Sequence, residues 1–158
     1  MFDAIKNFVA DLASGEKAGS LGDHDIRVAT AALLVHAAAI DGAMSDVGRD
    51  KLQSLLKQRF ALDDAAASEL IEQGSVADDQ AVDLYHFTHR LNDSLDDNDR
   101  LRMVEMMWVV AYADGTVSEY EDNLIWRVAD LLSVSSTERI ALRQRVADQS
   151  GKNKSGMA

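Results

Sequence analysis

Acidic residues at two Asp-Gly pairs carry the oxygen atoms in this chain that are best suited to bind a metal ion. Asp41-Gly42 and Asp114-Gly115 each follow an apolar stretch, and Glu121 comes shortly after the second pair. Hard cations such as Ca²⁺ take about six to eight oxygen ligands from carboxylates, carbonyls and waters. Asp41, Asp114 and Glu121 are therefore the candidate metal ligands. The loop is not an EF-hand, because its glycine follows the first aspartate directly.

The same residues have a second interpretation, in which they only end one helix and begin the next. Glycine readily takes the left-handed conformation that ends a helix. Ser118 and Glu121 have the spacing of a capping box, in which each side chain bonds to the other residue's backbone N–H. Acids in a first helical turn also suit the helix dipole. Metal binding and pure capping both remain open from the residues alone.

Three histidines are further candidate ligands by residue type. His86 and His89 stand three residues apart, a spacing that suits a transition metal, but no third strong ligand accompanies them. They are interpreted as part of an exposed polar face. His36 lies in an apolar segment and is interpreted as a core histidine with a hydrogen-bond partner.

Glu105 is a carboxylate inside an otherwise apolar segment. A buried carboxylate must be paired or protonated, and Arg102 and Arg127 are the expected partners. The methionine and tryptophan residues around it, between positions 103 and 108, have the spacing of a core stripe.

Sequence motifs of known catalytic sites are missing. There is no phosphate-binding glycine loop, no G-x-S-x-G and no H-E-x-x-H. We therefore expect no enzymatic activity, and a metal-assisted hydrolase remains only if a cleft lies beside the acids.

Length and charge limit the classes of partner. The chain has 158 residues, no cysteine and a net charge of −11. Its acidity disfavours nucleic acid and favours cations or basic protein surfaces. The most apolar stretch, residues 28–40, is too short to span a bilayer. No signal peptide is recognisable, so a cytoplasmic location is expected.

The elements that position these acids are expected to be helices. The chain lacks proline and any long alternating strand pattern, and it is rich in alanine and leucine. This predicts an all-α, compact bundle of seven to eight helices in one domain, residues 1–149, followed by a disordered tail, residues 150–158. The helices are expected over residues 2–12, 25–40, 45–60, 63–73, 78–92, 99–113, 118–132 and 135–148.

The two Asp-Gly pairs belong to an internal repeat. AAIDGAMSD (38–46) aligns with AYADGTVSE (111–119) without a gap. Each copy reads apolar helix, Asp-Gly, two residues, serine, acid, helix. Two such helical hairpins are expected to pack as pseudo-symmetric partners, because neither buries its apolar face alone.

The second copy, with the phrase RLRMVEMMWVVAYADGTVSEYEDNLI, resembles the TerB-like domain, which is named for tellurite-resistance proteins. The resemblance covers nearly the whole chain. It implies an all-helical bundle, neighbouring Asp-Gly units, acids that bind a divalent cation, and a link to tellurite and stress responses without an established reaction. Gly48 stands where the first copy would have its glutamate, so the second copy should dominate the affinity and the first should contribute mainly Asp41.

The sequence therefore predicts a TerB-like binding module that holds a divalent cation, Ca²⁺ first, at Asp41, Asp114 and Glu121. It would act through protein partners, with a homodimer as one form. The alternative is a metal-free structural adaptor for protein–protein interaction.

Overall fold

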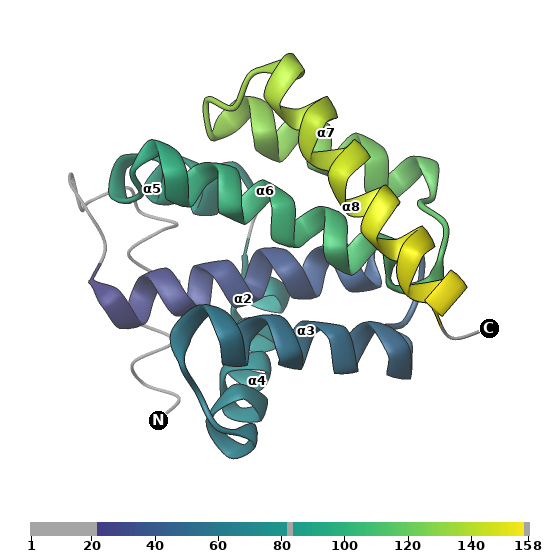
Figure 1. The fold of residues 1–158 in the computed structure, drawn as a ribbon. Coiled ribbons are helices and arrows are strands. Elements are labelled where there is room, and N and C mark those ends of the chain that lie inside the picture. Colours follow the sequence, from purple (N-terminus) through teal and green to yellow (C-terminus); the bar gives the residue numbers. More distant parts are fainter. Residues whose placement is uncertain (1–21, 82–83, 157–158) are drawn as a thin grey trace.

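The computed structural model describes residues 22–81 and 84–156, and this part of the chain is all-helical, as predicted (Figure 1). It contains seven α-helices, one short 3-10 helix and no strand. The helix predicted over residues 2–12 lies outside the described residues, and the pseudo-symmetry of the two units stays a prediction. In chain order the elements are α2 (Asp23–Ala39), α3 (Asp46–Phe60), α4 (Asp64–Gln80), α5 (Leu84–Ser94), α6 (Asp97–Ala111), η1 (Tyr112–Asp114), α7 (Glu119–Leu131) and α8 (Ser136–Gly156).

Helix α2 is the central helix of the bundle. It lies between α6 on one side and α3 and α4 on the other (Figure 1). A helix that is apolar nearly all round is expected in the centre of a core. Every residue from Val28 to Val35 is buried, which confirms that expectation.

Gly74 lies inside α4, where the sequence predicted a helix end. The prediction of one helix over 63–73 and a second from 78 is therefore wrong. A side chain on Gly74 would place its Cβ 2.7 Å from the Ala31 Cβ and 2.9 Å from the Ala32 nitrogen of α2. The glycine allows α4 to approach α2 closely, and it does so without ending the helix.

Helix α6 carries the methionine and tryptophan stripe into the core. Met103, Met106, Met107 and Trp108 are all buried, as predicted. The partner of Glu105 differs from the prediction, because its carboxylate pairs with Arg145 of α8 and not with Arg102 or Arg127. Helix α8 packs along α6, and the sequence alone did not indicate that contact.

The last helix is longer than predicted. Helix α8 continues to Gly156, so the expected end near Asp148 is too early. The division into a domain of residues 1–149 and a tail stays a prediction. None of the helices in the described ranges has the length and apolar character needed to cross a membrane.

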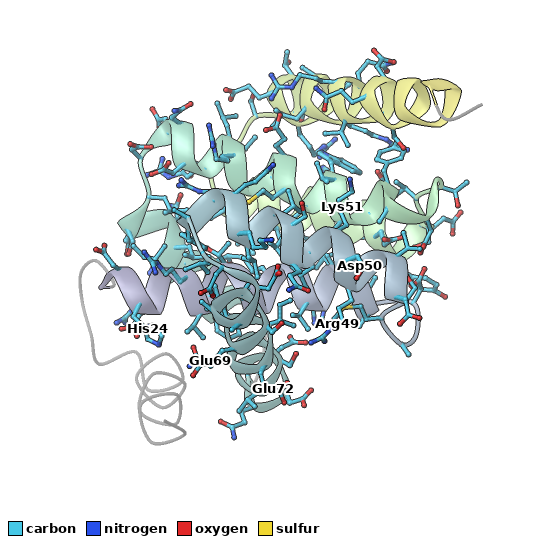
Figure 2. All side chains as sticks on the ribbon, turned by 60° about the horizontal axis from the view of Figure 1, so that its bottom comes forward. His24, Arg49, Asp50, Lys51, Glu69 and Glu72 are labelled. Atoms are coloured by element: carbon cyan, nitrogen blue, oxygen red, sulfur yellow. The ribbon has the colours of Figure 1, made fainter. Side chains whose placement is uncertain are left out.

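Charged side chains cover the outer faces of α3 and α4. Figure 2 shows Arg49, Asp50 and Lys51 on α3, and Glu69 and Glu72 on α4, all of them exposed. These faces surround the apolar contact between α2, α3 and α4. The first Asp-Gly turn lies just before Arg49, Asp50 and Lys51, at the end of α3 where that helix begins.

Candidate functional site

Both Asp-Gly pairs form turns that require glycine. Gly42 has a φ of 145° and Gly115 a φ of 95°, values that residues with a side chain rarely adopt. The N–H of Gly42 donates to the Ala39 carbonyl, and that of Gly115 donates to Tyr112. The second turn is tighter than predicted, because α6 ends at Ala111 and continues as the 3-10 helix η1. Each turn leaves its aspartate exposed to solvent.

A serine caps the helix that follows each turn, as predicted. The Gly48 N–H donates to the Ser45 Oγ at 3.0 Å, and the Glu121 N–H donates to the Ser118 Oγ at 3.2 Å. In the second unit the Ser118 N–H also donates to the Glu121 Oε1 at 3.0 Å, which completes a capping box. The first unit has no such box because Gly48 carries no carboxylate.

One hydrogen bond connects the two Asp-Gly units directly. The Ser45 hydroxyl donates to the Asp114 Oδ1 at 3.2 Å. The start of α3 and the end of η1 therefore lie side by side, although Ser45 and Asp114 are 69 positions apart in the sequence. The sequence predicts Ser45 only as a helix cap, and it does not indicate that its hydroxyl also bonds to the second Asp-Gly unit. A cap pattern predicts the acceptor bond of a serine but not the direction of its hydroxyl hydrogen.

Glu121 is the buried carboxylate of this site, with an exposed fraction of only 8%. Burial raises the pKa of Glu121 above its ordinary value, because a low-dielectric surrounding disfavours the charged form. The hydrogen bonds from Ser118 lower the pKa in part, and the negative charges of Asp41 and Asp114 raise it again. Asp41 and Asp114 therefore lie close enough to Glu121 for their charges to act on it.

The donor chemistry of the three residues suits a hard cation, since all their candidate atoms are carboxylate oxygens. Their positions do not form a ligand shell as they stand. Within residues 22–81 and 84–156, no group of three or more histidine or acidic side chains is placed to hold a metal ion. A cation would therefore require Asp41 and Asp114, both exposed, to turn toward Glu121.

His36 has the expected hydrogen-bond partner, but with 35% of its side chain exposed it lies at the edge of the core and not inside it. Its Nδ1 lies 3.0 Å from the Asp78 Oδ1, which joins α2 to α4. This hydrogen bond raises the pKa of His36, burial opposes the rise, and the charge of Asp78 adds to it. His89 is exposed, as predicted, and the side chain of His86 lies outside the described residues.

The His36–Asp78 pair predicts a specific dependence of stability on pH. The folded-state pKa of His36 is raised, so the pair's contribution is fully present below the unfolded value of about 6.5 and is lost as pH rises through the folded pKa. We expect a contribution below about 1 kcal/mol, because the ring is partly exposed. Urea unfolding of the wild type and His36→Gln at several pH values measures it. The difference in free energy of unfolding between them should shrink toward high pH.

An NMR titration of the His36 ring provides the control. In Asp78→Asn the pKa of His36 should fall back toward its ordinary value. A wild-type His36 that titrates at or below the ordinary histidine pKa contradicts the pairing.

A second polar contact beside the site joins residues that no local sequence pattern connects. Arg143 of α8 donates to the Asp122 Oδ1 at 2.7 Å and to the Tyr112 hydroxyl at 3.1 Å. These bonds attach α8 to η1 and to the first turn of α7. A hollow of about 490 Å³ opens next to them, and it is lined by Val117, Ser118, Glu119, Asp122, Asn123, Trp126 and Arg143.

An apolar helix, an Asp-Gly turn, a capping serine and a helix that begins with an acid follow one another twice in the described chain, from α2 to α3 and from α6 to α7. A family model described as tellurite resistance protein TerB matches residues 27–144. Neither the curated proteins nor the solved structures contain a match to the chain. The matched range includes both Asp-Gly turns, both serine caps and Glu121. The chain therefore belongs to the TerB family.

Proposed function

We propose that this chain is a TerB-family binding module that takes up a divalent cation, Ca²⁺ first, between its two Asp-Gly turns. In this proposal it acts in the cytoplasm through protein partners, in a response related to tellurite resistance. The observation that carries the proposal is that the buried carboxylate of Glu121 lies within electrostatic reach of two further carboxylates, those of Asp41 and Asp114, whose negative charges repel it. A bound cation would remove that repulsion and favour the ionised form of Glu121.

A cation at this site would share Asp114 and Glu121 with the hydrogen bonds that these carboxylates already accept. Asp114 gives up one oxygen lone pair to the Ser45 hydroxyl, and Glu121 gives up one to the Ser118 N–H. A carboxylate has two oxygens and about four acceptor positions, so each group keeps capacity for a cation. Asp41 follows the end of α2 and is exposed, which leaves its side chain free to rotate.

Thermal unfolding with and without Ca²⁺, Mg²⁺ or Zn²⁺ tests the proposal. A cation at about a hundred times its Kd stabilises the folded state by about 2.7 kcal/mol. For a chain of this size that raises the Tm by several degrees. Asp114→Asn and Glu121→Gln should both remove most of the rise, because each loses a carboxylate charge.

These two variants separate cation binding from capping. An asparagine at 114 still accepts the Ser45 hydroxyl bond, and a glutamine at 121 still completes the capping box. Asp63→Asn is the matched control, because it removes one charge, keeps its N-cap bond to Ala66 and lies beyond the far end of α3. It should respond to the cation like the wild type. The absence of a Tm rise with all three ions, or an unchanged rise in Glu121→Gln, contradicts the proposal.

The second candidate is a metal-free structural adaptor. The complete capping box of Ser118 and Glu121 favours it, because that box accounts for both residues without a ligand. In this case Glu121→Ala costs only the cap, about 1 kcal/mol, and divalent ions leave the Tm of every variant unchanged.

A further inference from the structure

A hollow lies between the end of α2 and the start of α7, and none of the three proposed cation ligands lines it. It measures about 290 Å³, at the lower end of the range for ligand pockets. It therefore suits a ligand smaller than a typical cofactor. Its lining residues are His36, Ile40, Glu119, Tyr120, Asn123, Leu124 and Arg127.

The two charged ends of this hollow have opposite signs. Helix α2 runs toward the first Asp-Gly turn and α7 runs away from the second, so Ile40 and Glu119 lie at the turn end. His36 stands one helical turn before Ile40, and Arg127 stands two turns after Glu119. Glu119 and Arg127 are eight residues apart on α7, so with a rise of about 1.5 Å per residue the acidic and basic ends are separated by roughly 12 Å along the helix axis.

The basic end is held in place by the core. His36 uses its Nδ1 for Asp78 of α4, so Nε2 is the ring nitrogen that remains for a ligand. Asp78 raises the pKa of His36 and favours the imidazolium form. Arg127 is exposed on α7 and offers a guanidinium, which binds carboxylates well.

Part of the lining is apolar. Ile40, the buried Leu124 and the ring of Tyr120, which is 68% exposed, line the hollow. Exposed tyrosine is common at binding surfaces, because its ring offers apolar area and its hydroxyl offers a hydrogen bond. Asn123 adds an amide beside it.

We propose that this hollow binds a short zwitterionic peptide of about three residues. Its ammonium group lies at Glu119, its carboxylate lies at His36 and Arg127, and an apolar side chain packs on Ile40, Leu124 and Tyr120. An extended chain spans about 3.3 to 3.6 Å per residue, so three residues cover most of the distance between the charged ends. The proposal goes beyond the cation site and does not depend on it.

Titration of the full chain with the tripeptide Ala-Leu-Ala in metal-free buffer, followed by the amide NMR signals of Tyr120, Asn123 and Arg127, tests this. We expect saturable shifts. Arg127→Gln and Glu119→Gln should each weaken binding about tenfold, because each loses one charged hydrogen bond. Arg139→Gln is the matched control, since it removes the same charge on α8, outside the hollow. It should bind like the wild type.

Blocked peptides test the two ends separately. N-acetyl-Ala-Leu-Ala should lose the contact with Glu119, and Ala-Leu-Ala amide the contact with His36 and Arg127, each with a loss of about tenfold. No saturable shift with the free tripeptide overturns the proposal. Equal binding of the doubly blocked peptide also overturns it, because the hollow would then recognise only the apolar side chain.

Discussion

Replacing Gly74 with alanine is expected to lower the free energy of unfolding by about 2 kcal/mol, although alanine is the better helix former. The added Cβ would lie 2.7 Å from the Ala31 Cβ and 2.9 Å from backbone atoms of Ala31 and Ala32. Backbone atoms of a buried helix cannot move aside as a flexible side chain can. Helices α2 and α4 must then separate, which loosens the core around Ala31. Urea unfolding followed by circular dichroism measures the loss.

Gly48→Ala is the matched control, since Gly48 is also buried inside a helix. Its added Cβ would meet only side-chain atoms, the Ser45 Oγ at 3.2 Å and the Met44 Cγ at 3.7 Å. We expect a change within about 1 kcal/mol, where the gain in helix propensity offsets a small adjustment of the cap. A Gly74→Ala protein as stable as Gly48→Ala would show that α2 and α4 do not approach so closely.

Replacing Trp108 with alanine is expected to lower the free energy of unfolding by about 4 kcal/mol. Only 1% of this residue is exposed, and it packs in α6 at the centre of the core. The Arg143 guanidinium lies 5.2 Å from the centre of its ring, and the Tyr112 ring lies 6.4 Å away. Among the described residues its indole N–H has no acceptor, so the truncation removes packing and leaves a cavity without breaking a hydrogen bond.

Trp126→Ala is the matched control, because it makes the same substitution at the surface. Half of this residue is exposed, and it contacts the Arg139 guanidinium at 5.9 Å. Trp126→Ala should therefore cost less than about 1 kcal/mol. Equal losses in the two tryptophan variants would contradict the position of Trp108 in the core.

Local sequence patterns predict much of the fold, because helix formation and helix capping depend on residues that are close together in the sequence. The apolar run before Asp41 predicted a central helix, and α2 is that helix. Serine followed by an acid predicted the caps at Ser45 and Ser118, and both caps are present. The prediction that a helix ends at Gly74 is wrong, because α4 continues through it. A glycine inside a helix and one that ends it look alike until the neighbouring helix is known.

Contacts between distant helices could not be predicted in the same way. Glu105 pairs with Arg145, and Ser45 bonds to Asp114, but neither pair shares a local pattern. Burial is the main cause of the raised pKa of Glu121, and the negative charges of Asp41 and Asp114 add to it. Metal binding would require the exposed side chains of Asp41 and Asp114 to rotate toward Glu121.

The most direct test of the cation proposal is the pKa of Glu121 itself, measured by carbon NMR of its side-chain carboxyl with and without Ca²⁺. Without the ion, the pKa should lie above the ordinary glutamate value, because the group is buried and faces two negative charges. Saturating Ca²⁺ should lower it, since a cation at the site favours the carboxylate. A Glu121 pKa that does not change at millimolar Ca²⁺ would contradict the account.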